Sequence, residues 1–302
     1  MSVQTAVIIP CYNEAAAIGS VVKKMRKVLP DAKIYVYDNN STDDTMKNAS
    51  EAGAIVRRVI QQGKGAVVRR MFADVDADVY VMTDGDMTYD IEAVPRLIDT
   101  LITQQKDIVI GTRIEQQQKA YRFGHRFGNR FLTEIVRILF GIKQTDMLSG
   151  LRVFSKRFVK TFPAISNGFE IETELNIFTR MNNLPYAEVQ TRYFARPEGS
   201  VSKLSTIKDG FKILFMIFRL FKRERPLFFY VLLSLLCLAG NIASVIRQET
   251  DPSAFPFYFF FGIGFLFFLL YGFVSNGQVK TRREYIRLAY LSYPFVEDND
   301  NC

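Results

Sequence analysis

Short apolar runs alternate with longer amphipathic stretches along the first third of the chain. Apolar runs that end at polar or turn-forming residues predict strands at Ala6–Ile9, Lys33–Tyr37, Ala54–Arg57, Val79–Thr83 and Asp107–Gly111. Apolar residues spaced three and four apart predict helices between them, at Ala15–Val28, after Ser41, at Gly65–Val75 and at Ile91–Thr103. Strands that alternate with helices in this way build a mostly parallel sheet covered on both faces, so the pattern predicts an α/β fold.

The last third of the chain is far more apolar. Residues 204–225 carry basic side chains between large apolar ones, as expected for a helix that lies in a membrane interface. The apolar positions are Ile207, Phe211, Leu214, Phe215, Phe218 and Phe221. Two uncharged segments follow, Leu227–Ile246 and Ala254–Val274. At about 1.5 Å per residue, each is long enough to cross a hydrocarbon core of about 30 Å. We therefore expect two transmembrane helices.

Basic residues flank the apolar pair on its outer sides. They are Lys222, Arg223 and Arg225 before the first segment, and Lys280, Arg282 and Arg283 after the second. The connection at 247–253 carries one basic residue, so both termini are expected in the cytoplasm. The first residues lack the basic start and the long apolar run of a signal peptide. The expected protein is a multi-pass membrane protein whose first 200 residues lie in the cytoplasm.

These patterns divide the chain into four parts. We expect a cytoplasmic α/β domain at 1–203, a juxtamembrane amphipathic helix at 204–226, a two-helix hairpin at 227–276 and a cytoplasmic tail at 277–302. Gly262 and Gly264 hint at close helix packing, which leaves a homo-oligomer open.

The composition of the chain limits the kinds of molecule that the protein could bind. The 302 residues are 48% hydrophobic and 23% charged, with a formal net charge of +8, which suits an anionic membrane surface and an anionic substrate. The chain has no Trp and no nucleic-acid motif, so we exclude nucleic acid as a partner. Cys11, Cys237 and Cys302 are too few and too dispersed for a disulfide framework or a metal site.

Candidate chemistry lies at the ends of the predicted strands. Asp84-Gly85-Asp86 follows the strand Val79–Thr83 and offers two carboxylates to a divalent cation, Mg²⁺ or Mn²⁺, that bridges to a diphosphate. The first two strands end at Pro10-Cys-Tyr12-Asn-Glu14 and at Asp38-Asn-Asn40-Ser-Thr-Asp43, and Ser41 or Thr42 is expected to cap the next helix. Taken singly, Glu14 also suits a helix start and Asp38 a turn. Gly63-Lys64-Gly65 suits either a plain loop or a close approach of the backbone to phosphate or sugar.

Together these motifs resemble family 2 glycosyltransferases with the GT-A fold, a Rossmann-like and mostly parallel sheet. The segments Asp146–Arg152, Gly168–Glu172 and Arg196–Lys203 resemble the dolichyl-phosphate mannose synthases and the bacterial polyprenyl-phosphate glycosyltransferases. The resemblance implies that Asp84 and Asp86 bind the metal and, with Arg113, form the catalytic centre. It assigns the nucleotide sugar to Pro10, Tyr12, Glu14, Asp38, Asn40, Lys64, Asp84 and Gly85. It assigns the lipid phosphate to Arg113, Arg126, Arg130, Ser149, Arg196 and Lys203.

The chain departs from the family pattern at two positions. Asn39 stands where the family often has a second Asp after the one at Asp38, so a second acidic contact with the nucleotide is missing. Thr88 stands where many members have Gln, which removes a third metal contact.

The nature of the acceptor decides whether a base is needed. A phosphate monoester, with a second pKa of about 6, is largely ionised near pH 7 and needs guanidinium groups instead of a base. Arg122, Arg126 and Arg130 would lie along one helical face, either against such an anion or in solvent. His125 is expected to be a packing or interfacial residue. Glu170 and Glu172 are either surface charges at the start of a helix Ile171–Met181 or the base of an enzyme that acts on a hydroxyl.

We therefore expect a membrane-bound inverting glycosyltransferase that moves a hexose from a UDP- or GDP-sugar to polyprenyl phosphate. One alternative is a membrane glycosyltransferase for a hydroxyl acceptor of a lipid or glycan, with Glu170 or Glu172 as base. Another is a non-catalytic membrane adaptor that binds a nucleotide sugar. The sequence leaves the sugar, the nucleotide and the lipid chain open.

Overall fold

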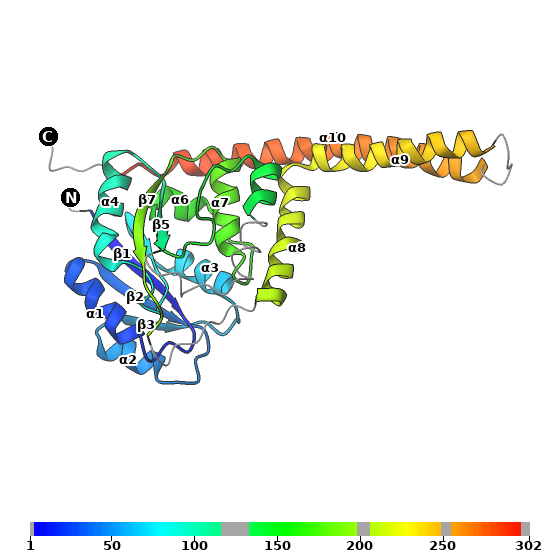
Figure 1. Ribbon diagram of the computed structural model, residues 1–302. Coiled ribbons are helices and arrows are strands. Elements are labelled where there is room, and N and C mark those ends of the chain that lie inside the picture. Colours follow the sequence, from blue (N-terminus) through cyan, green and yellow to red (C-terminus); the bar gives the residue numbers. More distant parts are fainter. Residues whose placement is uncertain (1–2, 116–132, 198–205, 249–254, 297–302) are drawn as a thin grey trace. The chain divides into compact units, whose positions relative to one another are not determined.

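The computed structural model describes residues 3–115, 133–197, 206–248 and 255–296. Contacts divide the chain into two units (Figure 1). The first comprises Met1–Met216 together with Leu288–Cys302, and the second comprises Ile217–Arg287. The end of the chain therefore belongs to the same unit as its beginning.

A mixed seven-stranded sheet, in the order β3-β2-β1-β4-β6-β5-β7, forms the centre of the first unit. The strands are β1 (Thr5–Cys11), β2 (Lys33–Asp38), β3 (Ile55–Arg58), β4 (Val79–Met82), β5 (Ile108–Glu115), β6 (Arg152–Ser155) and β7 (Tyr186–Tyr193). Pairing is parallel from β3 to β4 and between β5 and β7, whereas β6 runs antiparallel to both of its neighbours. The expected α/β class with a mostly parallel sheet is confirmed.

Helices cover both faces of this sheet (Figure 1). On one face lie α1 (Ile18–Val28), α2 (Thr45–Glu51), the short 3₁₀ helix η1 (Ile91–Ala93) and α4 (Val94–Thr103). On the other face lie α3 (Lys64–Asp74), α6 (Lys156–Thr161) and α7 (Ile171–Met181). The helix α7 has the predicted bounds, whereas α1 begins three residues later than predicted, because residues 15–17 form a turn.

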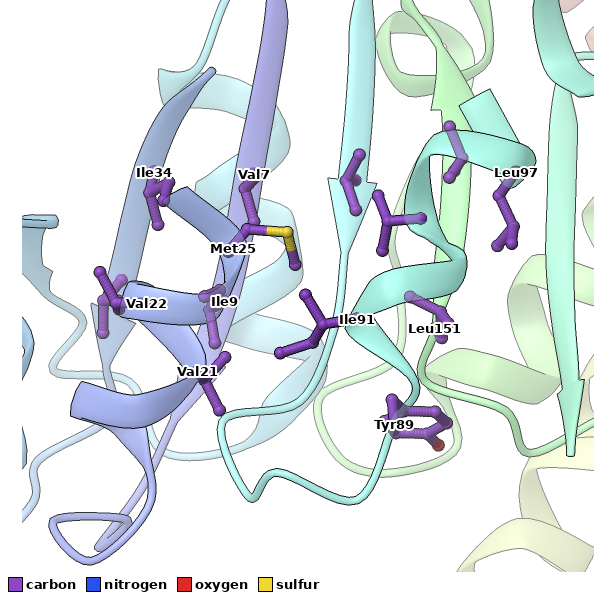
Figure 2. Close-up of a cluster of buried hydrophobic side chains, with 14 of the residues drawn as sticks. Val7, Ile9, Val21, Val22, Met25, Ile34, Tyr89, Ile91, Leu97 and Leu151 are labelled. Carbon is purple, nitrogen blue, oxygen red and sulfur yellow. The ribbon is translucent and has the colours of Figure 1, made fainter. Parts of the chain in front are cut away.

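The core between the sheet and the first set of helices is fully apolar. Figure 2 shows Val21 and Met25 of α1 pointing toward Val7 and Ile9 of β1. All four side chains are buried. Burying each such side chain contributes about 1.5–3 kcal/mol, so this face fixes α1 against the sheet. The position of the β1–α1 turn, which carries Glu14, follows from that packing.

Strand β6 and its antiparallel direction are absent from the sequence prediction. It has four residues and begins with Arg152, a charged side chain that is nonetheless fully buried. Phe154 of this strand stacks on Phe158 with ring centroids 5.1 Å apart. The burial of strand β6 depends on partners far along the chain, and the periodicity of apolar residues in the sequence does not predict such partners.

The second unit contains most of three long helices, α8 (Thr206–Glu224), α9 (Pro226–Gln248) and α10 (Phe255–Leu291). Pro226–Arg247 and Pro256–Leu291 are long and apolar enough to cross a membrane, each with a mean hydropathy of 2.1. Along α8, Phe215 and Phe218 are exposed, whereas Phe221, predicted on the same apolar face, is buried. The interfacial position of this helix stays a prediction. The second apolar helix is longer than predicted, because α10 continues past Val274 through a polar and basic stretch.

Glycines allow α9 and α10 to pack closely. A Cβ at Gly240 would lie 2.9 Å from the ring of Phe261, and one at Gly264 would lie 3.2 Å from Sγ of Cys237. Helix α10 also contacts the end of α8, where Arg282 donates to Oε1 of Glu224 at 2.8 Å. The small residues noted in the sequence thus mediate contacts within this helical hairpin.

The C-terminal segment at 288–296 packs onto the first unit. Tyr290 donates its hydroxyl proton to Oδ2 of the fully buried Asp107 at 2.7 Å. Arg157 donates to Oδ1 of the same carboxylate at 2.5 Å, and its guanidinium lies 4.5 Å from the ring of Tyr290 and 4.6 Å from that of Phe295. Phe295 and Val296 also pack against the core cluster. We call residues 288–296 the C-terminal strap.

Removing the tyrosine hydroxyl of the strap tests its contribution to stability. Tyr290→Phe leaves a buried carboxylate oxygen of Asp107 without this donor, so we expect the free energy of unfolding to fall by about 1–3 kcal/mol. Urea unfolding of detergent-purified protein measures the change. The matched control is Tyr285→Phe, because Tyr285 is 69% exposed. Equal stability of the two variants would show that the strap contact contributes nothing.

Candidate active site

The Asp84-Gly85-Asp86 turn lies at the carboxyl end of β4, beside the end of β1. A Cβ at Gly85 would lie 2.5 Å from Sγ of the buried Cys11, so the turn is pressed against β1. Burial and the charges of Glu14, Asp38, Asp84 and Asp86 raise the pKa of the Cys11 thiol. These carboxylates, which come from three strand ends, therefore surround one point, as the sequence predicts.

Asp86 is buried and held from two sides. Thr88 donates to Oδ1 through its hydroxyl at 2.6 Å and through its backbone N–H at 3.1 Å. Arg196 contacts Oδ2 at 2.7 Å and Glu14 at 3.8 Å. Burial and the charge of Asp84 raise the pKa of Asp86, and Arg196 and Thr88 oppose this rise. Thr88 thus orients the carboxylate of Asp86.

Asp84 shares Lys64 with Glu172 of α7. Nζ of Lys64 lies 2.6 Å from Oδ1 of Asp84 and 2.5 Å from Oε1 of Glu172. Burial alone would lower the pKa of Lys64, but the two carboxylates outweigh it and raise the pKa. Glu172 is buried, and its Oε2 has no hydrogen-bond partner in the described part of the chain. The interpretation of Glu172 as a surface charge is wrong, whereas half-buried Glu170 accepts a hydrogen bond from Gly168 N at 3.1 Å.

The loop before β6 forms a wall beside Asp84. A Cβ at Gly150 would lie 2.6 Å from Oδ2 of Asp84, so the backbone of this loop reaches the carboxylate. The N–H of Gly150 donates to the hydroxyl of Tyr89 at 2.6 Å. Arg152 fixes the loop from beneath by donating to the carbonyls of Ser149 at 2.9 Å and Met147 at 3.1 Å. This role of Arg152 is not predictable from the sequence, because full burial is an unusual state for arginine.

Arg113, expected at the lipid phosphate, forms a two-pronged ion pair. Its Nε and Nη2 each lie 2.7 Å from an oxygen of Asp146, and its guanidinium lies 5.3 Å from the ring of Tyr193. Burial disfavours ionisation of Asp146, but the hydrogen bonds and charge of Arg113 outweigh burial and lower the pKa of this carboxyl. Ser149 is fully buried and donates its hydroxyl proton to the carbonyl of Gly111 at 2.5 Å. The assignment of Arg113 and Ser149 to the lipid phosphate stays a prediction.

The Asp38-Asn-Asn40 segment is buried against the chain that leaves β3. Asp38 Oδ2 accepts the backbone N–H of Ser41 at 3.0 Å, and Asp38 Oδ1 is buried with no hydrogen-bond partner among the described residues. The side-chain amide of Asn39 donates to the carbonyls of Val59 and Gln61. A carboxylate cannot donate in this way, which explains why asparagine fits here.

Two sequence interpretations of nearby residues are wrong. Neither Ser41 nor Thr42 caps a helix, because α2 begins at Thr45 after Asp44 and Ser41 Oγ accepts the N–H of Asn13 at 2.8 Å. The glycines around Lys64 serve a close backbone contact, since a Cβ at Gly65 would lie 2.2 Å from the carbonyl oxygen of Ser166. The Gly-Lys-Gly segment therefore packs directly against the chain segment that leads into α7.

Some of the other predicted site residues lie in β1 and the loops near the site, and some lie outside the described residues. Pro10 lies within β1 opposite Tyr37, and Tyr12 is 38% exposed beside the site. Asn40 donates to the carbonyl of Ile60 at 2.7 Å. Arg126, Arg130 and Lys203, together with Arg122 and His125, lie outside the described residues. Their proposed roles stay predictions.

Asp84 and Asp86 present carboxylate oxygens, the ligand type that suits Mg²⁺ and Mn²⁺, so these two residues would hold such an ion. No group of three metal-ligating side chains occurs within the described ranges. Mg²⁺ in particular is usually bound in this way, through one or two carboxylates and substrate phosphates.

Comparison with known proteins identifies the family. A model described as Glycosyl transferase family 2 matches residues 6–162, which is more than half of the chain. The chain belongs to glycosyl transferase family 2. Glycosyltransferase AglJ of Haloferax volcanii is 34% identical over 226 residues, which cover 74% of each protein. The dolichyl-phosphate hexose transferase of the same organism is 30% identical over 220 residues, covering 73% of this chain and 95% of that protein.

A solved structure supports the fold of this family 2 glycosyltransferase. Glucosyl-3-phosphoglycerate synthase from Mycobacterium tuberculosis, in complex with Mn²⁺, UDP-glucose and phosphoglyceric acid, superposes with a TM-score of 0.59. The match is 23% identical and covers 72% of this chain and 80% of that chain. It confirms the expected GT-A-type fold.

Gly150 provides a test of the wall beside Asp84 in this glycosyltransferase. Gly150→Ala places a methyl group 2.6 Å from the carboxylate, so Asp84 must move away from the site. We expect turnover to fall by more than about ten-fold and the free energy of unfolding to fall by about 1–3 kcal/mol. Gly277→Ala is the control, since a Cβ there meets nothing within 4 Å. Turnover that is equal in both variants would remove Gly150 from the site.

Proposed function

We propose that this glycosyltransferase moves a hexose from a UDP- or GDP-sugar to the phosphate of a polyprenyl lipid at a membrane. The family supplies the reaction class. The similarity to the dolichyl-phosphate hexose transferase of Haloferax volcanii supports a lipid phosphate as acceptor. The UDP-glucose in the mycobacterial complex supports a nucleotide sugar as donor.

The ion pair between Lys64 and Glu172 carries this proposal. A hydroxyl acceptor needs a general base within reach, whereas a phosphate arrives already ionised. Oε1 of Glu172 is paired with Lys64 at 2.5 Å and Oε2 is buried, so this side chain holds a cation against Asp84 instead of facing an acceptor. That arrangement suits an enzyme with no need of a base.

On the donor side, Asp84 and Asp86 would hold Mg²⁺ or Mn²⁺ against the diphosphate. When bound, such a metal ion neutralises the charge that develops on the departing diphosphate. Lys64 contacts Asp84 and Arg196 contacts Asp86, so these two cations bring further positive charge to the leaving group. Oδ1 of Asp38, which has no hydrogen-bond partner among the described residues, would accept a hydrogen bond from the nucleoside.

On the acceptor side, a phosphate oxygen of the lipid forms a bond to the anomeric carbon. The bond from that carbon to the diphosphate breaks on the opposite face, so an α-linked donor gives a β-linked product and a nucleoside diphosphate. No proton needs to be removed. Arg113 is the described guanidinium that we assign to the lipid phosphate, and its pair with Asp146 fixes its direction. Arg126, Arg130 and Lys203 remain proposed contacts.

The C-terminal strap supports a membrane hairpin. Residues 288–296 lie in the same unit as the sheet, so α9 and α10 must cross a membrane together and return to the same side. The flanking basic residues favour the cytoplasm for that side. A polyprenyl phosphate would thus meet the site at the cytoplasmic face.

Glu170 favours a second candidate function. This side chain, two positions before Glu172 in the chain, is half-buried and forms no ion pair within the described ranges, so it is the better placed base for a hydroxyl acceptor. Loss of more than about 100-fold in turnover on Glu170→Gln, together with indifference to polyprenyl phosphate, would favour transfer to a hydroxyl.

The reaction is tested by nucleoside diphosphate release from a panel of UDP- and GDP-sugars, with Mg²⁺ or Mn²⁺, in the presence and absence of polyprenyl phosphate. We expect release to require the lipid and mass spectrometry to detect a lipid one hexose heavier. Asp86→Asn should reduce turnover by at least about 100-fold, because it removes a charge from the metal site. The control variant is Asp31→Asn, which changes an exposed residue between α1 and β2. Normal turnover of Asp86→Asn at saturating donor would reject the metal assignment.

The topology has a separate test. A reporter placed between α9 and α10 should lie on the opposite side of the membrane from reporters at both termini. Protease protection in sealed vesicles measures this. All three reporters on one side would contradict the hairpin.

A further inference from the structure

Tyr193, the last residue of β7, contacts the guanidinium of Arg113. Strands β5 and β7 are parallel, with Arg113 opposite Thr191. Tyr193 is two residues further along β7, so its side chain lies on the same face of the sheet as that of Arg113. Cζ of Arg113 lies over the Tyr193 ring, 5.3 Å from its centroid. This distance is within the range of about 6 Å over which a guanidinium is attracted to an aromatic face.

Tyr193 and Asp146 hold Arg113 from two directions. Nε and Nη2 of Arg113 each lie 2.7 Å from an oxygen of Asp146, so the carboxylate fixes one edge of the planar guanidinium. A pair at one edge still lets the plane tilt, and the Tyr193 ring limits that tilt. The side chain of Arg113 is only 13% exposed, so both contacts are largely shielded from water, which strengthens them.

Tyr193 is itself held by the segment that follows the two metal carboxylates. Tyr89 forms an antiparallel bridge with Tyr193, and the two rings meet edge to face with centroids 5.4 Å apart. The N–H of Phe194 donates to the carbonyl of Thr88 at 2.9 Å. The ring of Tyr193 therefore contacts both a buried tyrosine on the donor side and the guanidinium on the acceptor side.

Ion pairs on either side of Tyr193 join the same two segments. Nη2 of Arg196 lies 2.7 Å from Oδ2 of Asp86. Nε of Arg192 lies 3.0 Å from Oδ2 of Asp90. The backbone around Tyr193 is thus fixed to the chain that leaves the metal carboxylates, which gives its ring a defined place relative to the proposed metal site.

The proposed transfer requires such a defined place. The lipid phosphate must reach the anomeric carbon on the face opposite the diphosphate, and a misplacement of about 1 Å can cost about 100-fold in rate. A guanidinium that binds the phosphate must therefore keep a fixed offset from the carboxylates that hold the metal. Among the described residues, Tyr193 contacts Arg113 directly and belongs to the segment that is bonded to Asp86 through Arg196.

We propose that Tyr193 is a positioning residue that holds Arg113 at the angle at which it binds the lipid phosphate. The inference rests on the proposed function, because it takes Arg113 to bind that phosphate. Tyr193 acts through Arg113 and need not touch the substrate. The aromatic ring carries the role, because the ring makes the contacts with both Arg113 and Tyr89.

Steady-state kinetics of the full-length protein in detergent test the inference, with undecaprenyl phosphate or dolichyl phosphate as acceptor. Tyr193→Met removes the ring and keeps an apolar side chain, so we expect the KM for the lipid phosphate to rise by about ten-fold. The KM for the nucleotide sugar should change by less than about three-fold, because Asp84 and Asp86 keep their own partners. Tyr193→Phe keeps the ring and should restore the KM for the lipid phosphate to within about two-fold. The matched control is Tyr186→Met, at the first residue of the same strand.

The outcomes separate this inference from the proposed function. A KM for the lipid phosphate that is equal in Tyr193→Met and Tyr186→Met overturns the positioning role while leaving the glycosyl transfer in place. A Tyr193→Phe variant as impaired as Tyr193→Met does the same, as does an equal rise in the KM for the nucleotide sugar. Absence of a lipid product from the unaltered protein with every donor overturns the proposed function and this inference with it. If Tyr193→Met does not fold, Tyr193→Leu is measured against the same control.

Discussion

The structure depends on balancing negative charge in one crevice. Glu14, Asp84, Asp86 and Glu172 bring four carboxylates together at the end of the sheet, where burial alone would be costly. Lys64 and Arg196 repay that cost by contacting two carboxylates each. Because these six residues come from five separate segments of the chain, the ion pairs also fix the positions of α3, α7 and the segment after β7. The same charges that tie the fold together are the ones that a diphosphate and its metal would meet.

Close backbone contacts support this arrangement. Gly65 lets the segment before α7 pass over the start of α3, and Gly150 lets the loop before β6 reach Asp84. Arg152 then holds that loop from below through backbone carbonyls. The buried guanidinium of Arg152 thus fixes the shape of the site without lying in the site. Precise placement of Asp84 is a property of this backbone more than of any side-chain partner.

The sequence predicted where the candidate site residues lie better than it predicted which residues they contact. Asp84, Asp86 and Asp38 follow apolar runs, so the rule that strands end at the ligand crevice was enough to group them. The pairing of Lys64 with Glu172 joins residues far apart in the chain, and no local pattern reports it. The exchange of Asp for Asn39 looked like the loss of a contact, whereas the structure gives the amide two carbonyls to hold. The strand β6 was missed because its four residues begin with an arginine.

The C-terminal strap has a consequence for biosynthesis. Residues 288–296 leave the ribosome after the 71 residues of Ile217–Arg287, the whole second unit. At about 5–20 residues per second, the sheet waits about 4–14 s for its last packing partners. During that interval Asp107 lacks the hydroxyl of Tyr290, and the core lacks Phe295. Completion of the catalytic domain therefore comes after the apolar helices have been made, which couples its final packing to their delivery.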